Sequence, residues 1–142
     1  MLIVRNDQIV YAIPIDVDGI EETLLTMHSI TFDCARPALV GQFWADALGY
    51  DVDRSEDDLA SVVARDGQGP RLLFLQVPEG KSVKNRVHLD LAATDMETEV
   101  ERLVNLGART VKLYDYGSAD RFMVMQDPEG NEFCVEHAPS PA

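Results

Sequence analysis

The amino-acid sequence predicts an α+β fold built from two consecutive βαβββ modules. Two segments repeat apolar residues at three- and four-residue steps, which is the spacing of a helix with one buried face. The segments around them are short and alternate apolar with polar residues, as strands with one buried face do. Because the order βαβββ occurs twice along the chain, we expect two related halves.

The first helix is expected from Pro37 to Leu48, and Phe43 and Trp44 belong to its apolar stripe. Proline is tolerated in a first helical turn, and Gly49 follows the last apolar residue as helix-ending glycines do. The aromatic side chains are expected to anchor this helix to a sheet.

The second helix is expected from about Asp95 to Leu106. Thr94 and Glu97 have the spacing of a capping box, in which each side chain accepts a hydrogen bond from the backbone of the other residue. Gly107 is the C-terminal glycine.

The candidate strands lie at His28–Cys34, Tyr50–Arg54, Leu59–Arg65, Arg71–Val77, Arg86–Ala92, Arg109–Tyr114, Arg121–Gln126 and Glu132–His137. The two halves have nearly the same length. His28 and Asp66 are 38 residues apart in the first half, and His88 and Asp127 are 39 residues apart in the second.

We assign residues 27–142 to one domain, made of modules 27–78 and 85–138. Residues 1–26 form an N-terminal extension, in which a hairpin and then a short helical turn at residues 20–25 are expected. A strand-rich extension of this kind covers a sheet edge or reaches a partner subunit.

The chain of 142 residues carries 12 basic and 25 acidic side chains, so its formal net charge is −13. A net-negative field repels phosphate, which argues against nucleic acid or an anionic membrane as the main partner and favours a cationic small ligand. No stretch approaches the roughly 18 apolar residues that span a bilayer, and no signal peptide is evident. Cys34 and Cys134 match neither a zinc-ligand spacing nor a disulfide framework, so we expect reduced thiols in a cytoplasmic protein.

Four segments between Met27 and His137 resemble motifs of a known superfamily: FWADALGY, KNRVHLDL, LVNLGA and DPEGNEFCV. They are similar to the vicinal-oxygen-chelate superfamily of glyoxalase I, bleomycin-resistance proteins and extradiol dioxygenases, and within it to a glyoxalase-like subgroup. The resemblance implies that the modules form a curved mixed sheet with a central cavity. A shared fold does not fix the reaction.

In the metal-using members of this superfamily, each module contributes one metal ligand from its first strand and one from its last. The resemblance places these positions at Ser29, Leu73, His88 and Cys134. Only His88 is an imidazole or carboxylate ligand of the usual kind, and Glu136, on the strand face of Cys134, is a carboxylate that could substitute. We therefore expect no metal cofactor, with a divalent metal as the alternative.

Strand alternation and the resemblance together give the expected cavity residues. The expected ligand-binding residues are Ser29, Thr31, Asp33, Arg86, His88, Asp90, Tyr116, Cys134 and Glu136. Tyr116 is included because an aromatic side chain at a cavity rim stacks on flat ligands and cations. His88, oriented by Asp90, forms the candidate catalytic pair. A histidine held structurally by Asp90 or Asp33 is the competing interpretation.

The leading hypothesis is a small-molecule-binding protein of the glyoxalase/bleomycin-resistance type, with its ligand in the cupped-sheet cavity. A metal-dependent lyase, isomerase or dioxygenase, with His88 and Glu136 among its metal ligands, is the first alternative. A metal-free acid–base enzyme that uses His88 and Asp90 is the second. We also expect a homodimer, because modules of this type leave sheet edges and the extension supplies additional apolar strand.

Overall fold

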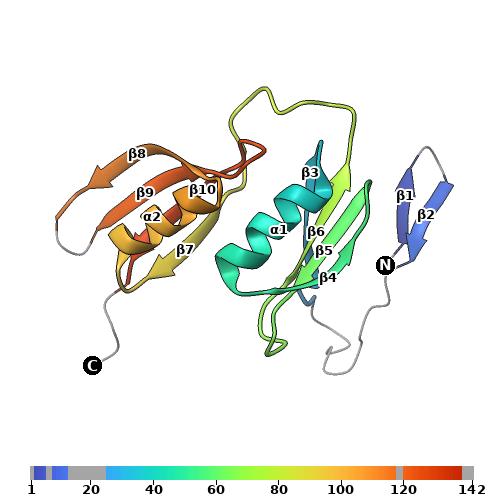
Figure 1. Cartoon of the computed structure of the whole chain (residues 1–142), viewed down its shortest axis with the longest axis horizontal. Helices are drawn as coiled ribbons and strands as arrows, with labels where there is room; N and C mark the ends of the chain where they lie inside the picture. Colours follow the sequence, from blue (N-terminus) through green and yellow to red (C-terminus); the bar gives the residue numbers. More distant parts are fainter. Residues whose placement is uncertain (1, 6–7, 13–24, 118–119, 139–142) are drawn as a thin grey trace.

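A computed structural model of the chain describes residues 2–5, 8–12, 25–117 and 120–138. The expected α+β fold of two βαβββ modules is confirmed (Figure 1). In chain order the elements are β1 (Leu2–Arg5), β2 (Gln8–Ala12), β3 (Ser29–Cys34), α1 (Pro37–Leu48), β4 (Asp51–Ser55), β5 (Leu59–Val63), β6 (Arg71–Gln76), β7 (Leu89–Ala93), α2 (Met96–Leu106), β8 (Arg109–Asp115), β9 (Arg121–Gln126) and β10 (Glu132–His137).

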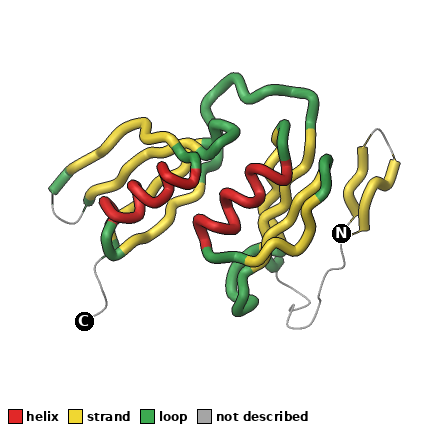
Figure 2. Tube along the Cα trace, viewed as in Figure 1, coloured by secondary structure: helices red, strands yellow, loops and turns green. Residues whose placement is uncertain are grey.

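Each module forms its own four-stranded mixed sheet. The strand orders are β3-β6-β5-β4 in sheet 1 and β7-β10-β9-β8 in sheet 2. In both sheets the first and last strands of the module pair in parallel, and the remaining pairs are antiparallel. The modules therefore share one topology, and β3 and β7 are both edge strands of their sheets. Figure 2 shows the long loop that joins β6 to β7 across the junction between the modules.

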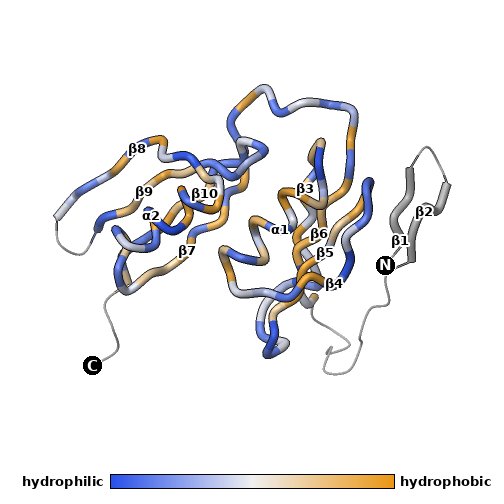
Figure 3. The backbone as a smooth tube through the Cα atoms, viewed as in Figure 1, coloured by the Kyte–Doolittle hydropathy of each residue, from blue (hydrophilic) through white to orange (hydrophobic). Residues whose placement is uncertain are grey.

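Helix α1 begins and ends where the sequence predicts. Pro37 occupies the first turn, and Gly49 closes the helix in the left-handed region with φ of 66°. The helix packs across β4, β5 and β6, and Phe43 and Trp44 are 3% and 1% exposed. Figure 3 shows hydrophobic residues concentrated along α1 and the strands beside it.

Helix α2 has a different N-terminal cap from the one expected. Asp95 is the cap, and its carboxylate accepts a hydrogen bond from the backbone N of Thr98 at 3.0 Å. The expected capping box of Thr94 and Glu97 is therefore wrong by one residue, because a carboxylate at position 95 already satisfies the free N–H groups of the first turn. Gly107 ends the helix as expected, with φ of 115°.

The helix-bearing sides of the two modules meet and share one core. The rings of Trp44 on α1 and Phe133 on β10 lie 5.1 Å apart between centroids. The Arg102 guanidinium on α2 donates hydrogen bonds to the backbone oxygens of Asp46 and Ala47, at 3.1 and 2.8 Å, at the C-terminal end of α1. The helix-free face of each sheet is therefore the face turned away from this shared core.

In the N-terminal extension, β1 and β2 pair antiparallel, with a register shift between Ile3 and Val4. The helical turn expected at residues 20–25 falls almost entirely outside the described residues. Figure 1 places the β1–β2 hairpin on the side of sheet 1 opposite α1. No helix in the described part of the chain is long and apolar enough to cross a membrane.

Candidate functional site

Three chemically different side chains gather on the helix-free face of sheet 2. Parallel pairing of β7 with β10 sets Asp90 opposite Cys134. His88 precedes Asp90 by two residues, so it points to the same side. Its Nδ1 atom lies 3.1 Å from Asp90 Oδ1, and one ligand atom from each of His88, Asp90 and Cys134 lies within 4.8 Å of the others. We call these three residues the donor cluster.

The donor cluster combines a buried thiol with two exposed polar groups. Cys134 is only 6% exposed, whereas His88 and Asp90 are exposed. Burial, together with the hydrogen bond to Asp90 and the negative charge of Asp90, raises the pKa of the Cys134 thiol to about 11. The thiol is therefore protonated at neutral pH and has a carboxylate acceptor beside it.

The equivalent positions of the first module carry a different chemistry. Parallel pairing of β3 with β6 sets Thr31 opposite Leu73, and Ser29 precedes Thr31 by two residues. These three residues occupy the places of Asp90, Cys134 and His88. A hydroxyl pair and an aliphatic side chain do not make a divalent-metal site. A metal site with ligands from both modules, as the resemblance implies, therefore does not fit this chain.

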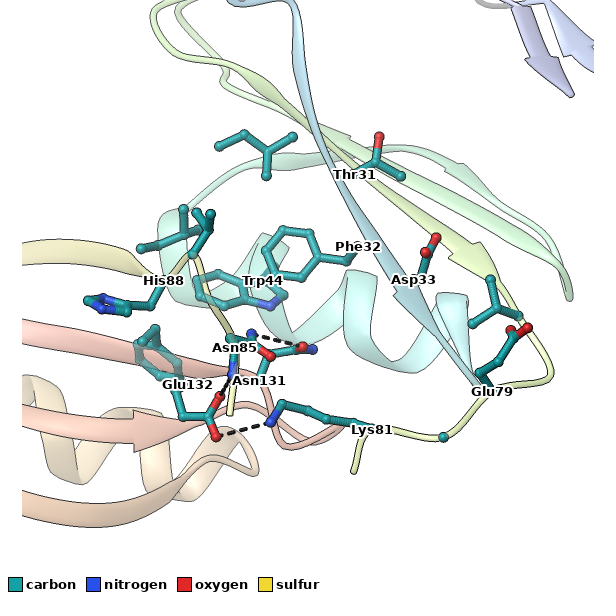
Figure 4. Close-up of a pocket in the computed structure, with 16 residues that line it drawn as sticks. Thr31, Phe32, Asp33, Trp44, Glu79, Lys81, Asn85, His88, Asn131 and Glu132 are labelled. Atoms are coloured by element: carbon teal, nitrogen blue, oxygen red, sulfur yellow. Dashed lines mark hydrogen bonds and ion pairs between the residues drawn. The ribbon is translucent and has the colours of Figure 1, made fainter. Parts of the chain in front are cut away.

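A cavity of about 710 Å³ lies between the modules, at the edge strands β3 and β7. We call it the junction pocket. Its apolar lining consists of Ile30, Phe32, Trp44, Val77, Val87, Leu89 and Phe133. Its polar lining consists of Thr31, Asp33, Glu79, Gly80, Lys81, Asn85, His88, Asn131 and Glu132. Figure 4 shows Trp44 and Phe32 at the centre of this pocket, with His88 on one side and Asp33 and Glu79 on the other.

A polar network pins one wall of the junction pocket to β10. The Glu132 carboxylate accepts hydrogen bonds from Lys81 Nζ at 3.0 Å and from the backbone N of Asn85 at 2.9 Å. Asn85 Nδ2 in turn donates to Asn131 Oδ1 at 3.2 Å. Burial alone would raise the pKa of Glu132, but these hydrogen bonds outweigh it and lower the pKa to about 2. The β6–β7 loop is thus tied to sheet 2 by an ionised carboxylate (Figure 4).

The aromatic floor of the pocket is held by a buried carboxylate. Trp44 Nε1 donates to Asp127 Oδ2 at 3.0 Å, and Asp127 has no exposed surface. The same side chain accepts from the backbone N of Glu129 and of Asn131, both at 2.9 Å. Asp127 therefore orients the indole that lines the pocket.

The charge of the junction pocket is negative. Lys81 is paired with Glu132 at 3.0 Å. Within the described ranges, neither Asp33 nor Glu79 forms an ion pair, and both are exposed. The pocket therefore keeps two carboxylates at its rim without an ion-pair partner.

The structure distributes the expected site residues over three places. Thr31, Asp33 and His88 line the junction pocket, and His88, Asp90 and Cys134 form the donor cluster. Tyr116 and Glu136 line a separate, smaller hollow of about 250 Å³ together with Phe122 and His137. Ser29 and Arg86 belong to none of these three places. Arg86 lies before β7, because this strand begins at Leu89 rather than at residue 86.

Several pocket residues were not identified as site residues from the sequence. The clearest are Glu79, Lys81 and Asn85 on the β6–β7 loop, and Asn131 beside β10. Loop residues have no periodicity that reveals their direction.

Comparisons with known proteins agree with this architecture. A family model described as a glyoxalase-like domain matches residues 29–136. A glyoxalase-related enzyme from Fulvimarina pelagi is 15% identical, with a TM-score of 0.64, and the match covers 81% of this chain and 89% of that chain. A search of curated proteins finds no match.

Two further solved structures have known ligands. The bleomycin-binding protein from Streptomyces verticillus, complexed with copper(II)-bleomycin, is 18% identical with a TM-score of 0.55, over 82% of this chain and 98% of that chain. The fosfomycin resistance protein FosX from Listeria monocytogenes, complexed with manganese(II) and dihydroxypropylphosphonic acid, is 13% identical with a TM-score of 0.64, over 81% and 90%. Likenesses at these identities show the fold alone. The family model spans more than half of the sequence, and the chain therefore belongs to the glyoxalase-like family of the vicinal-oxygen-chelate superfamily.

Proposed function

We propose that this protein binds a cationic small molecule with a flat or apolar body in the junction pocket. The observation that carries the proposal is the combination of an aromatic floor with two uncompensated rim carboxylates. Half-buried Phe32 supplies the aromatic surface of the floor, with the buried Trp44 and Phe133 directly behind it, and Asp33 and Glu79 supply the charge. Aromatic faces and carboxylates both attract cations.

The pocket has the size and preorganisation of a ligand site. A volume of about 710 Å³ falls in the range of cavities that enclose drug-sized molecules. The hydrogen bonds of Trp44 to Asp127 and of Lys81 and Asn85 to Glu132 hold the floor and one wall without a ligand. Less ordering is then needed on binding. The bleomycin-binding protein, which has a similar fold, holds a small molecule, and this supports the general assignment.

Binding is tested with polycyclic aromatic amines and with carboxylates that have the same ring systems, measured by calorimetry. We expect the amines to bind at least about tenfold more tightly than the matched carboxylates, equivalent to about 1.4 kcal/mol. Asp33→Asn should reduce this preference, because it deletes one of the two rim charges.

Asp57→Asn is the matched control, since Asp57 is an exposed carboxylate in the β4–β5 turn. It should leave the affinity for amines unchanged. Equal or tighter binding of the carboxylates, or equal effects of both substitutions, would contradict the proposal.

A further inference from the structure

The donor cluster lies wholly within the second module. Asp90 lies on β7, Cys134 lies on the paired strand β10, and His88 directly precedes β7. Their relative positions follow from the β7–β10 register. No residue of the first module is needed to bring an imidazole, a carboxylate and a sulfur atom together. Of the three, only His88 lines the junction pocket, and the pocket proposal gives none of them a role, so the cluster calls for a separate explanation.

The distances are close to those of a bound ion. Zinc bonds of about 2.0–2.3 Å in a tetrahedron place ligand atoms about 3.3–3.8 Å apart. The ligand atoms of the cluster lie within 4.8 Å of one another, so side-chain movements of about 1 Å would close the site. His88 and Asp90 are exposed, which leaves room for a water molecule as a fourth ligand. Three protein ligands with one open position are typical of catalytic zinc sites.

The donor types select among metals. Thiolate and imidazole favour zinc and cobalt(II), whereas magnesium, calcium and manganese prefer sites built from oxygen atoms. A site with one sulfur, one nitrogen and one oxygen ligand therefore favours zinc over manganese, which is the ion in the FosX structure.

We propose that His88, Asp90 and Cys134 form a zinc site contained within the second module, with Asp90 as the third ligand. Binding replaces the S–H bond of Cys134 by a sulfur–metal bond, and the thiol proton passes to the buffer. The ion would sit beside the junction pocket, because His88 belongs to both. The proposal does not depend on the cationic ligand and goes beyond the binding function.

The test is a titration of the metal-stripped full-length protein with cobalt(II) alone, followed by absorption. A thiolate bound to cobalt gives a near-ultraviolet charge-transfer band, and tetrahedral cobalt gives intense visible bands. We expect both bands to saturate at one cobalt per chain and to disappear on addition of zinc. Cys134→Ser should abolish the charge-transfer band, and His88→Gln and Asp90→Asn should each weaken cobalt binding by about 100-fold or more.

The chain supplies a matched control for each ligand type: Cys34→Ser, His137→Gln and, at an exposed carboxylate in the β4–β5 turn, Asp57→Asn. Each of these should retain the bands of the parent protein. Circular dichroism shows which variants fold, and Cys134→Ala provides a second test of the thiol. Asp33→Asn should leave cobalt binding unchanged, which separates this proposal from the pocket proposal.

Two results would overturn the zinc site. One is the absence of a charge-transfer band in the parent protein at millimolar cobalt. The other is a band that persists in Cys134→Ser or is lost in Cys34→Ser. In either case the donor cluster is a hydrogen-bonded group in which Asp90 orients His88, as in an acid–base pair.

Discussion

Trp44 and Asp127 are joined by a buried hydrogen bond of 3.0 Å between residues 83 positions apart. This bond links helix α1 of the first module to the β9–β10 turn of the second. Because Asp127 also accepts two backbone hydrogen bonds within its own turn, one carboxylate fixes the turn, the module junction and the floor of the junction pocket.

Asp127→Ala should be strongly destabilising. The substitution leaves the indole N–H and two backbone N–H groups in buried or half-buried positions without their acceptor, and we expect a loss of about 3–5 kcal/mol. Urea unfolding followed by far-ultraviolet circular dichroism measures it. Asp46→Ala, at an exposed carboxylate on α1, should change stability by less than about 0.5 kcal/mol. A loss below about 1 kcal/mol in Asp127→Ala would show that the junction is held by apolar packing instead.

Glu132 should make stability depend on pH in the acid range. Its pKa is about 2 in the folded protein against 4.5 for the ordinary group. A carboxylate with a depressed pKa stabilises the fold above about pH 4.5, and this contribution is lost as the pH falls toward 2. Glu132→Gln should therefore be about 2 kcal/mol less stable than the parent at pH 7, with the difference shrinking toward zero near pH 2.

The pH dependence is measured by urea unfolding at several pH values between 7 and 2. Glu101→Gln is the control, because Glu101 is an exposed carboxylate on α2. Its effect should be small at every pH. A Glu132→Gln penalty that stays constant through this range would mean that packing, rather than ionisation, explains the contribution of Glu132.

Gly41 should resist substitution although it lies within a helix. A Cβ at this position would lie 3.0 Å from Ala60 Cβ and 3.3 Å from Phe74 Cδ2, both on sheet 1. Alanine gains about 1 kcal/mol in helix propensity, but overpacking costs about 1–3 kcal/mol. We expect Gly41→Ala to lower the free energy of unfolding by about 1 kcal/mol in urea. A more stable variant would show that α1 can move away from the sheet at little cost.

The fold was predictable from the sequence because its signals are local. Strands β9 and β10 and helix α1 have the predicted bounds, since apolar periodicity and turn residues determine where such elements start and stop. The start of β7 was less well predicted. The alternation of polar and apolar residues continues back to Arg86, but the hydrogen-bonded pairing of β7 with β10 begins only at Leu89.

The site was predictable only in part, because it depends on pairings between distant segments. Alternation correctly separated Asp90 from Leu89 and Leu91, which pack against the core. It could not show that Asp90 lies opposite Cys134, which needs the β7–β10 register. Nor could it show that Trp44 reaches Asp127. These contacts arise from the assembly of complete modules.

The N-terminal extension should protect a buried apolar surface that no helix covers. Leu59 and Leu73 are 0% and 1% exposed, but they lie on the helix-free face of sheet 1 and outside the main core cluster. The β1–β2 hairpin lies on this side of sheet 1 in Figure 1, and we propose that the extension adds to the protection of these leucines. Deleting residues 1–26 should therefore lower the melting temperature by about 10 °C.

The same deletion tests the proposed homodimer, measured by light scattering. If the extension helps to hold two copies together, the truncated chain should become monomeric. Leu73→Ala gives the matched comparison: it should cost about 2–4 kcal/mol in the full chain but much less in the truncated chain, where the leucine has already lost its cover. An unchanged melting temperature and oligomeric state, or an equal cost of Leu73→Ala in both chains, would mean that residues 1–26 neither cover sheet 1 nor contribute to assembly.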